Sequence, residues 1–152
     1  MRVFVDTNVA LRLTQPTHPH HAASLEALEA ARRRGDELTI APQVLYEFWV
    51  VSTRPTDQRG LGLSTEDADA ELAKALAVFT LLPDTAEIFE QWRRLVVGLN
   101  VKGKTAHDAR LVASMIVHGV GSILTFNGSD FARYPDIAVL HPADYASDAA
   151  NP

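Results

Sequence analysis

Short apolar runs alternate with longer amphipathic segments along this chain. The short runs are typical of buried strands, and the longer segments carry apolar residues at helical spacing. The predicted strands cover residues 2–6, 38–41, 79–82, 122–126 and 137–140. The predicted helices cover residues 9–13, 20–34, 42–53, 65–78, 85–97 and 106–118. Strands that alternate with helices predict an α/β fold, here a three-layer α/β/α sandwich with a mainly parallel central sheet.

Local signals indicate where some of these helices begin and end. Ser64, with Asp67 three residues later, is typical of a helix start. Gly35 is predicted to end the helix that precedes it. On that helix we expect Leu25 and Leu28 to face inward.

The composition narrows the class of protein. A chain of 152 residues with 47% hydrophobic and 22% charged residues is typical of one globular domain, expected to cover residues 1–146. Residues 147–152 are predicted to form a disordered tail. The chain has no cysteine, no run of about 18 apolar residues and no signal-peptide pattern, which fits a cytoplasmic location. The net charge of -5 argues against a broad basic surface, although carboxylates gathered around metal ions would themselves lower the charge.

Four acidic residues stand where an isolated surface charge would be unusual. Asp6 ends the first predicted strand, Glu47 interrupts an apolar helix, Asp108 begins another helix, and Asp130 follows the strand 122–126. A carboxylate beside an apolar core is costly unless it is paired or bound to a cation. We expect the four to converge at the carboxyl ends of the strands, where their repulsion calls for a hard cation such as Mg²⁺ or Mn²⁺. Such an ion can activate water for attack on a phosphodiester.

Each carboxylate also has a purely structural interpretation. The two aspartates that follow strands could each cap a short helix or turn. Asp108 could complete a capping box with Thr105, and Glu47 could pair with Arg54 on the surface. The occurrence of all four together favours one shared site over four independent caps and pairs.

A second motif must be weighed against this site. Residues 98–105 match the phosphate-binding loop pattern G-x-x-x-x-G-K-[ST]. Such a loop should follow a buried strand, whereas residues 85–97 have the pattern of a helix, so a phosphate-loop NTPase is a minor alternative. In a nuclease, the same region would place Lys102, Lys104 and Arg110 where they could contact RNA phosphates.

Four segments, in this order and at this spacing, resemble the PIN-domain family, and most closely its VapC-type ribonuclease toxins. The segments are residues 5–9, 46–48, 107–111 and 124–131. The resemblance covers residues 2 to about 145. It implies a Mg²⁺- or Mn²⁺-dependent endoribonuclease that is the toxin of a type II toxin–antitoxin pair. It further implies a homodimer and neutralisation by a small cognate antitoxin.

The resemblance also assigns roles to individual residues. The catalytic and metal-binding residues would be Asp6, Glu47, Asp108 and Asp130. The residues that orient these carboxylates and their waters would be Thr7, Asn8, Thr125 and Asn127. The chain departs from many relatives in having Asn127 where they carry an aspartate, so weaker binding of a second metal ion is expected. The sequence is also compatible with an inert protein that uses the same fold as a scaffold, and with a structure-specific DNA nuclease that has the same site.

Overall fold

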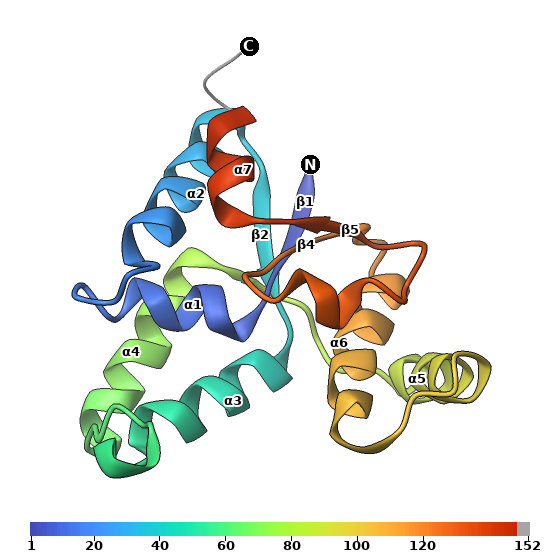
Figure 1. The fold of residues 1–152 in the computed structure, drawn as a ribbon, viewed down its shortest axis with the longest axis horizontal. Coiled ribbons are helices and arrows are strands. Elements are labelled where there is room, and N and C mark those ends of the chain that lie inside the picture. Colours follow the sequence, from blue (N-terminus) through green and yellow to red (C-terminus); the bar gives the residue numbers. More distant parts are fainter. Residues whose placement is uncertain (149–152) are drawn as a thin grey trace.

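The apolar runs form one parallel sheet in the computed structural model, which describes residues 1–148 (Figure 1). The strands are β1 (Arg2–Val5), β2 (Glu37–Ile40), β3 (Thr80–Leu81), β4 (Ser122–Leu124) and β5 (Ala138–Leu140). Their order is β3-β2-β1-β4-β5, and all neighbouring strands pair in parallel. β1 lies at the centre, and its Val3, Phe4 and Val5 are fully buried. The predicted parallel sheet is therefore confirmed.

Helices cover both faces of this sheet. They are α1 (Thr7–Leu13), α2 (His21–Arg34), α3 (Pro42–Thr53), α4 (Thr65–Val78), α5 (Ala86–Gly98), α6 (Ala106–Val117) and α7 (Pro142–Asp148). Because the chain builds β2 and β3 on one side of β1 and then returns to β4 on the other, right-handed crossovers place the two groups of helices on opposite faces. In Figure 1, α1, α2 and α7 lie together, and α5 packs beside α6 across the sheet. The predicted α/β/α sandwich is confirmed.

Most predicted helix ends are also confirmed. Ser64 Oγ accepts a hydrogen bond from the Asp67 N–H at 3.1 Å, as a helix cap should. Gly35 ends α2 with a φ of 71°, a left-handed conformation that favours glycine. The predicted inner face of α2 is only partly correct, because Leu28 packs half-buried against the core whereas Leu25 is exposed. Small residues form the buried face instead and allow α2 to pack closely: Ser24, Ala27, Ala30 and Ala31.

The C-terminal helix α7 was not predicted from the sequence pattern. It is short, and it is held by the burial of Tyr145 rather than by a long apolar stripe. α7 includes Ser147 and Asp148, the first residues of the predicted tail, and residues 149–152 lie outside the described part of the chain. β4 ends at Leu124 rather than at residue 126, which leaves Thr125 free to turn its side chain toward β1. None of the described helices is long and apolar enough to span a membrane.

Candidate active site

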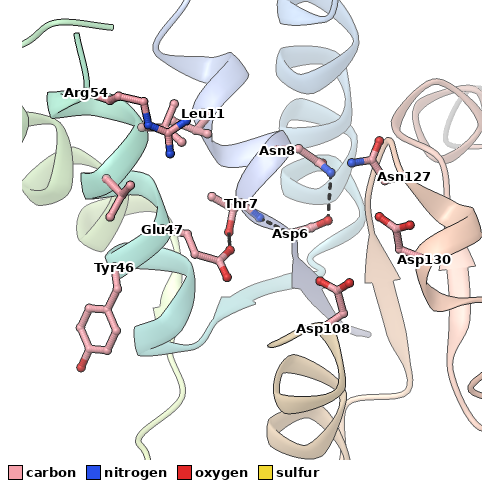
Figure 2. A pocket seen from close by; sticks show the side chains of 12 residues that line it. Asp6, Thr7, Asn8, Leu11, Tyr46, Glu47, Arg54, Asp108, Asn127 and Asp130 are labelled. Atoms are coloured by element: carbon pink, nitrogen blue, oxygen red, sulfur yellow. Dashed lines mark hydrogen bonds between the residues drawn. The ribbon is translucent and has the colours of Figure 1, made fainter. Parts of the chain in front are cut away.

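The direction of strand order changes between β1 and β4, and the candidate site lies at this point. In open α/β sheets, ligands bind beyond the carboxyl ends of the strands at such a switch. Asp6 directly follows β1, and its backbone N–H donates to the Leu124 carbonyl of β4 at 3.0 Å. A pocket of about 480 Å³ opens here (Figure 2). It is lined by Asp6, Thr7, Asn8, Leu11, Tyr46, Glu47, Val50, Val51, Arg54, Asp108, Asn127 and Asp130.

All four predicted acidic residues thus line one pocket, although they come from four separate segments. Figure 2 shows three aspartate carboxylates turned toward one space, with Glu47 across from them. α3, α6 and the short 3-10 helix η3 (Gly128–Phe131) each contribute one of these residues, and the turn after β1 contributes Asp6.

Asp6 is the most deeply buried of the four, with 8% of its surface exposed. Its Oδ1 accepts from the Thr7 N–H at 2.7 Å, so Asp6 does cap α1. Its Oδ2 accepts from Thr125 Oγ1 at 2.7 Å and from Asn8 Nδ2 at 2.9 Å. The capping interpretation is therefore correct but incomplete, because the second carboxylate oxygen is held at the pocket by two further groups.

The environment of Asp6 disfavours its charge. Burial raises the pKa of Asp6 to about 6, and the hydrogen bonds from Thr125 and Thr7 only partly oppose this rise. The carboxylates of Glu47 and Asp108 raise the pKa of Asp6 further. A bound cation would reverse this balance, because it favours the ionised carboxylate.

Glu47 projects from α3 toward the start of α1. Its Oε2 accepts from Thr7 Oγ1 at 2.7 Å, and its Oε1 accepts from Gln43 Nε2 at 2.9 Å. Gln43 Nε2 also donates to the His107 carbonyl at 2.9 Å, which links this part of α3 to α6. Within the described residues Glu47 forms no salt bridge with Arg54, so the interpretation as a surface ion pair is wrong.

Asp108 is half-buried in the first turn of α6, and Asp130 is exposed on η3. Thr105 Oγ1 donates to the Lys102 carbonyl at 2.8 Å and makes no side-chain cap on α6, so the predicted capping box is wrong. Burial raises the pKa of Asp108, and the nearby charges of Asp130 and Glu47 add to this effect. No hydrogen bond of the Asp130 side chain is formed with another described residue, and the predicted cap on the following turn is absent from this part of the chain.

The polar residues expected to orient the carboxylates surround Asp6. Asn8 Nδ2 donates to Asp6 Oδ2 and also lies 3.1 Å from Thr125 Oγ1. Thr125 Oγ1 in turn accepts from the Asn127 N–H at 3.0 Å. The Asn127 side chain lines the pocket beside Asn8 (Figure 2). These contacts tie the end of β4 to the start of α1, and they hold Asp6 in one orientation.

The predicted cations do not reach this pocket. Lys102 and Lys104 are exposed on the turn before α6 and are not among the pocket residues. Arg110 pairs with Asp84, with Nη2 and Oδ1 2.9 Å apart. Arg54 is the only lysine or arginine among the described residues that line the pocket. The sequence pattern alone assigns Arg54 to a surface ion pair with Glu47 and gives no sign of this place in the pocket.

Residues 98–105 do not have the setting of a phosphate-binding loop. They follow α5, which ends at Gly98, whereas a phosphate loop follows a buried strand. Residues 103–105 form the 3-10 helix η2 (Gly103–Thr105), directly before α6. The segment is therefore a connection between two helices that pack against each other.

The donor set fits a hard divalent cation in its chemistry. Within the described residues, none of the four carboxylates forms a salt bridge with lysine or arginine, and the nearby charges of Arg133 and His107 only partly offset the rise in the pKa of Asp108. No group of three or more His, Asp or Glu side chains in this part of the chain lies close enough to hold one ion. The expectation that all four carboxylates directly bind one shared ion is therefore not met as the side chains lie. Mg²⁺, however, commonly keeps several waters and takes only one or two protein carboxylates.

Comparisons with known proteins bear on both the fold and the family. The chain is similar to VapBC2 from Rickettsia felis in a complex with a promoter DNA fragment, with a TM-score of 0.70 and 18% identity over 92% of this chain and 98% of that one. It is similar to a toxin–antitoxin complex from Klebsiella pneumoniae, with a TM-score of 0.65 and 22% identity over 92% of this chain and 97% of that one. It is also similar to VapC20 from Mycobacterium tuberculosis, a sarcin-ricin loop cleaving toxin, with a TM-score of 0.65 and 22% identity over 87% and 95% of the two chains. No curated protein matches the chain.

At these identities the solved structures establish the fold alone. The family model described as PIN domain matches residues 3–137, a range that includes all four acidic residues of the pocket. The order of the strands and the place of the pocket agree with that match. This chain belongs to the PIN-domain family.

Proposed function

We propose that this protein is a metal-dependent endoribonuclease and the toxin of a toxin–antitoxin pair. The observation that carries the proposal is the gathering of four carboxylates, none of them in a salt bridge among the described residues, on one pocket at the switch point of the sheet. RNA as the substrate is supported by the similarity to VapC20, a sarcin-ricin loop cleaving toxin. The toxin role is supported by the similarity to VapBC and other toxin–antitoxin complexes.

Asp6, Glu47, Asp108 and Asp130 would hold one or two Mg²⁺ or Mn²⁺ ions, in pairs or through water. The bound cation supplies the electrophilic chemistry, since it neutralises charge on the phosphodiester and lowers the pKa of the attacking water. Because only the ionised carboxylates bind metal, the raised pKa of Asp6, about 6, makes metal affinity fall as the pH drops through this value.

Thr7 would hold two of these carboxylates in place by hydrogen bonds. Its backbone N–H donates to Asp6, and its hydroxyl donates to Glu47. Asn8 and Thr125 hold the other oxygen of Asp6. Such supporting hydrogen bonds keep ligands in one orientation, and their loss typically lowers metal affinity or activity by about 10- to 100-fold.

The partners proposed for this toxin are a small cognate antitoxin and a second copy of the chain, in the cytoplasm. Large apolar side chains exposed on α3 and α5 support protein–protein contacts of this kind. They are Tyr46, Phe89 and Val97, and Val97 is 76% exposed.

A catalytically inert scaffold is the second candidate. It is favoured by one observation, that no three acidic or histidine side chains among the described residues lie close enough to hold one ion. The two candidates differ in whether metal binds the pocket at all.

Cleavage assays with the purified protein separate these candidates. We expect cleavage of single-stranded RNA that requires added Mg²⁺ or Mn²⁺ and stops with EDTA. Asp6→Asn and Asp108→Asn should each reduce the rate by at least about a hundredfold, since they remove proposed ligands. Asp69→Asn, an exposed aspartate on α4, is the matched control and should cleave like the wild type. Undiminished cleavage by both site variants would exclude the proposed mechanism. A wild type that cleaves no RNA, with or without added metal, would favour the scaffold.

A further inference from the structure

The pocket has two chemically different halves. One half holds the four carboxylates, and the other contains Leu11 and Arg54; Val50 and Val51, which precede Arg54 on α3, also line the pocket. Figure 2 shows the Arg54 side chain extending from the end of α3 toward Leu11, on the side away from Asp108 and Asp130. Tyr46 points away from the carboxylates in the same view. The pocket therefore pairs an acidic half with an apolar half that contains one cation.

The guanidinium of Arg54 has no partner within the described chain. No hydrogen bond or salt bridge joins it to another described residue, although the residue is half-buried. Glu47 lies on the same face of α3, about 10 Å away along the helix axis, but it is already bonded to Thr7 and Gln43. An arginine at a pocket with its donors unused is suited to binding an anion from outside the chain.

The backbone around Arg54 is held firmly. Its N–H donates to the Val50 carbonyl at 3.1 Å, and its own carbonyl accepts from the Gly62 N–H at 2.9 Å. Gly60 packs so closely against it that a Cβ on Gly60 would lie 1.9 Å from the Arg54 carbonyl oxygen. Only glycine therefore permits this turn, and the turn fixes where the arginine side chain begins.

We propose that the Arg54 half of the pocket is a nucleotide subsite for a single-stranded RNA substrate. Arg54 binds the phosphate next to the scissile one, and Leu11, Val50 and Val51 cover the apolar surface of that nucleotide. The inference rests on the proposed nuclease function. An RNA strand repeats its charge at every nucleotide, so a strand with one phosphate at the carboxylate half presents another to a cation farther along. Since Arg54 is the only lysine or arginine among the described residues that line the pocket, it would also select the direction in which the strand lies.

The test is the affinity for a single-stranded RNA oligonucleotide, measured by fluorescence anisotropy across a series of salt concentrations. All proteins carry Asp108→Asn so that binding is measured without cleavage. Arg54→Gln should weaken binding about tenfold and reduce the slope of log K against log salt by about 0.7, the loss of one phosphate contact. Arg54→Lys should keep most of the slope, because it keeps the charge. Arg93→Gln removes an exposed arginine of α5 outside the pocket and should change neither quantity.

The outcomes separate this inference from the nuclease proposal. If RNA binding depends on Arg54 but the wild type cleaves no RNA under any metal condition, the RNA subsite is supported and the nuclease proposal is overturned. Metal-dependent cleavage by the wild type, with Arg54→Gln binding no more weakly than Arg93→Gln, would overturn the subsite alone. Sedimentation of each variant tests whether a second copy of the chain occupies this face instead of RNA. A change in self-association without a change in RNA affinity would make the face a protein interface and overturn the subsite.

Discussion

Two aspartates, Asp6 and Asp36, lie at opposite ends of the same sheet, the first buried and the second half-buried. Asp6 as a whole residue is 8% exposed, whereas Asp36 keeps an exposed backbone although only 6% of its side chain is exposed. Asp36 accepts from Tyr145 Oη at 2.6 Å and from Arg34 Nε at 3.0 Å, and it also pairs with the ammonium of Met1. Asp6 accepts only from neutral donors among the described residues.

This difference in partners has opposite effects on the two pKa values. Burial tends to raise both. At Asp36, hydrogen bonds from the N-terminal ammonium, Tyr145 and Arg34 outweigh burial and hold the pKa below its ordinary value. At Asp6 burial prevails and the pKa rises to about 6. A buried carboxylate that the chain itself neutralises joins parts of the fold, whereas one that the chain leaves unneutralised is suited to bind a cation.

The largest effect expected from this contrast is a pH dependence of stability in the metal-free protein. Asp6 has a pKa of about 6 when folded and 3.8 when unfolded, so the folded state binds more protons between these values. The Asp6 contribution to the free energy of unfolding is fully present below about pH 4 and is lost as the pH rises through about 6, by up to about 3 kcal/mol. Urea unfolding in EDTA, compared between wild type and Asp6→Asn at each pH, isolates this contribution. A difference between the two proteins that does not vary with pH would contradict it.

Metal should stabilise the fold through the Asp6 end of the sheet and not through Asp36. At a free Mn²⁺ concentration about a hundred times the Kd, binding to the folded state adds about 2.7 kcal/mol to the free energy of unfolding. Thermal unfolding should therefore show a rise in Tm for wild type and for Asp69→Asn, and a much smaller one for Asp6→Asn. Equal shifts in all three proteins would mean that Mn²⁺ binds elsewhere.

Removing the charge of Asp36 should reduce the stability of the fold and leave the pocket at Asp6 intact. Asp36→Asn removes the charge that holds Arg34 at the end of α2 and Tyr145 in α7, and we expect a loss of about 2 kcal/mol. Arg34 also lies 3.8 Å from the centre of the Tyr145 ring, so part of the contact between α2 and α7 should remain. Chemical denaturation measures the loss, and RNA cleavage well below the unfolding midpoint should match wild type. A lowered cleavage rate in the fully folded variant would contradict the separation of the two regions.

The smallest effect concerns the hydroxyl that supports Asp6. Thr125→Val keeps the shape of the side chain and removes the donor 2.7 Å from Asp6 Oδ2. We expect about a tenfold loss of RNA cleavage, with the pKa of Asp6 rising further because a hydrogen bond to its charged form is lost. The pH profile of cleavage should shift upward in Thr125→Val and return toward wild type in Thr125→Ser. An unchanged profile in Thr125→Val would show that this hydroxyl has no part in holding the carboxylate.

The acidic residues were accessible to sequence reasoning because each interrupts a local pattern. Asp6 follows a buried strand and Glu47 breaks an apolar helix, so a charge at either place has a visible cost. Asp36 shows no such signal, since it lies in a polar turn beside Gly35. Its importance depends on Tyr145, which is far away in the sequence. Arg54 was misassigned for a related reason, since spacing along α3 brings it to the face of Glu47 but does not tell whether the two side chains meet.

The alternation of strands and helices, the parallel sheet and the four carboxylates could all be predicted from the order of residues, because burial and helical periodicity are local properties of the chain. Which polar groups meet across the sheet became known only from the folded chain. There, Thr125 and Asn8 bond to Asp6, Arg110 pairs with Asp84 and bonds to Gln43, and Arg54 lines the pocket without a partner among the described residues. These contacts depend on the order in which strands pair and on how helices rotate against them, and both follow from the packing of the whole chain.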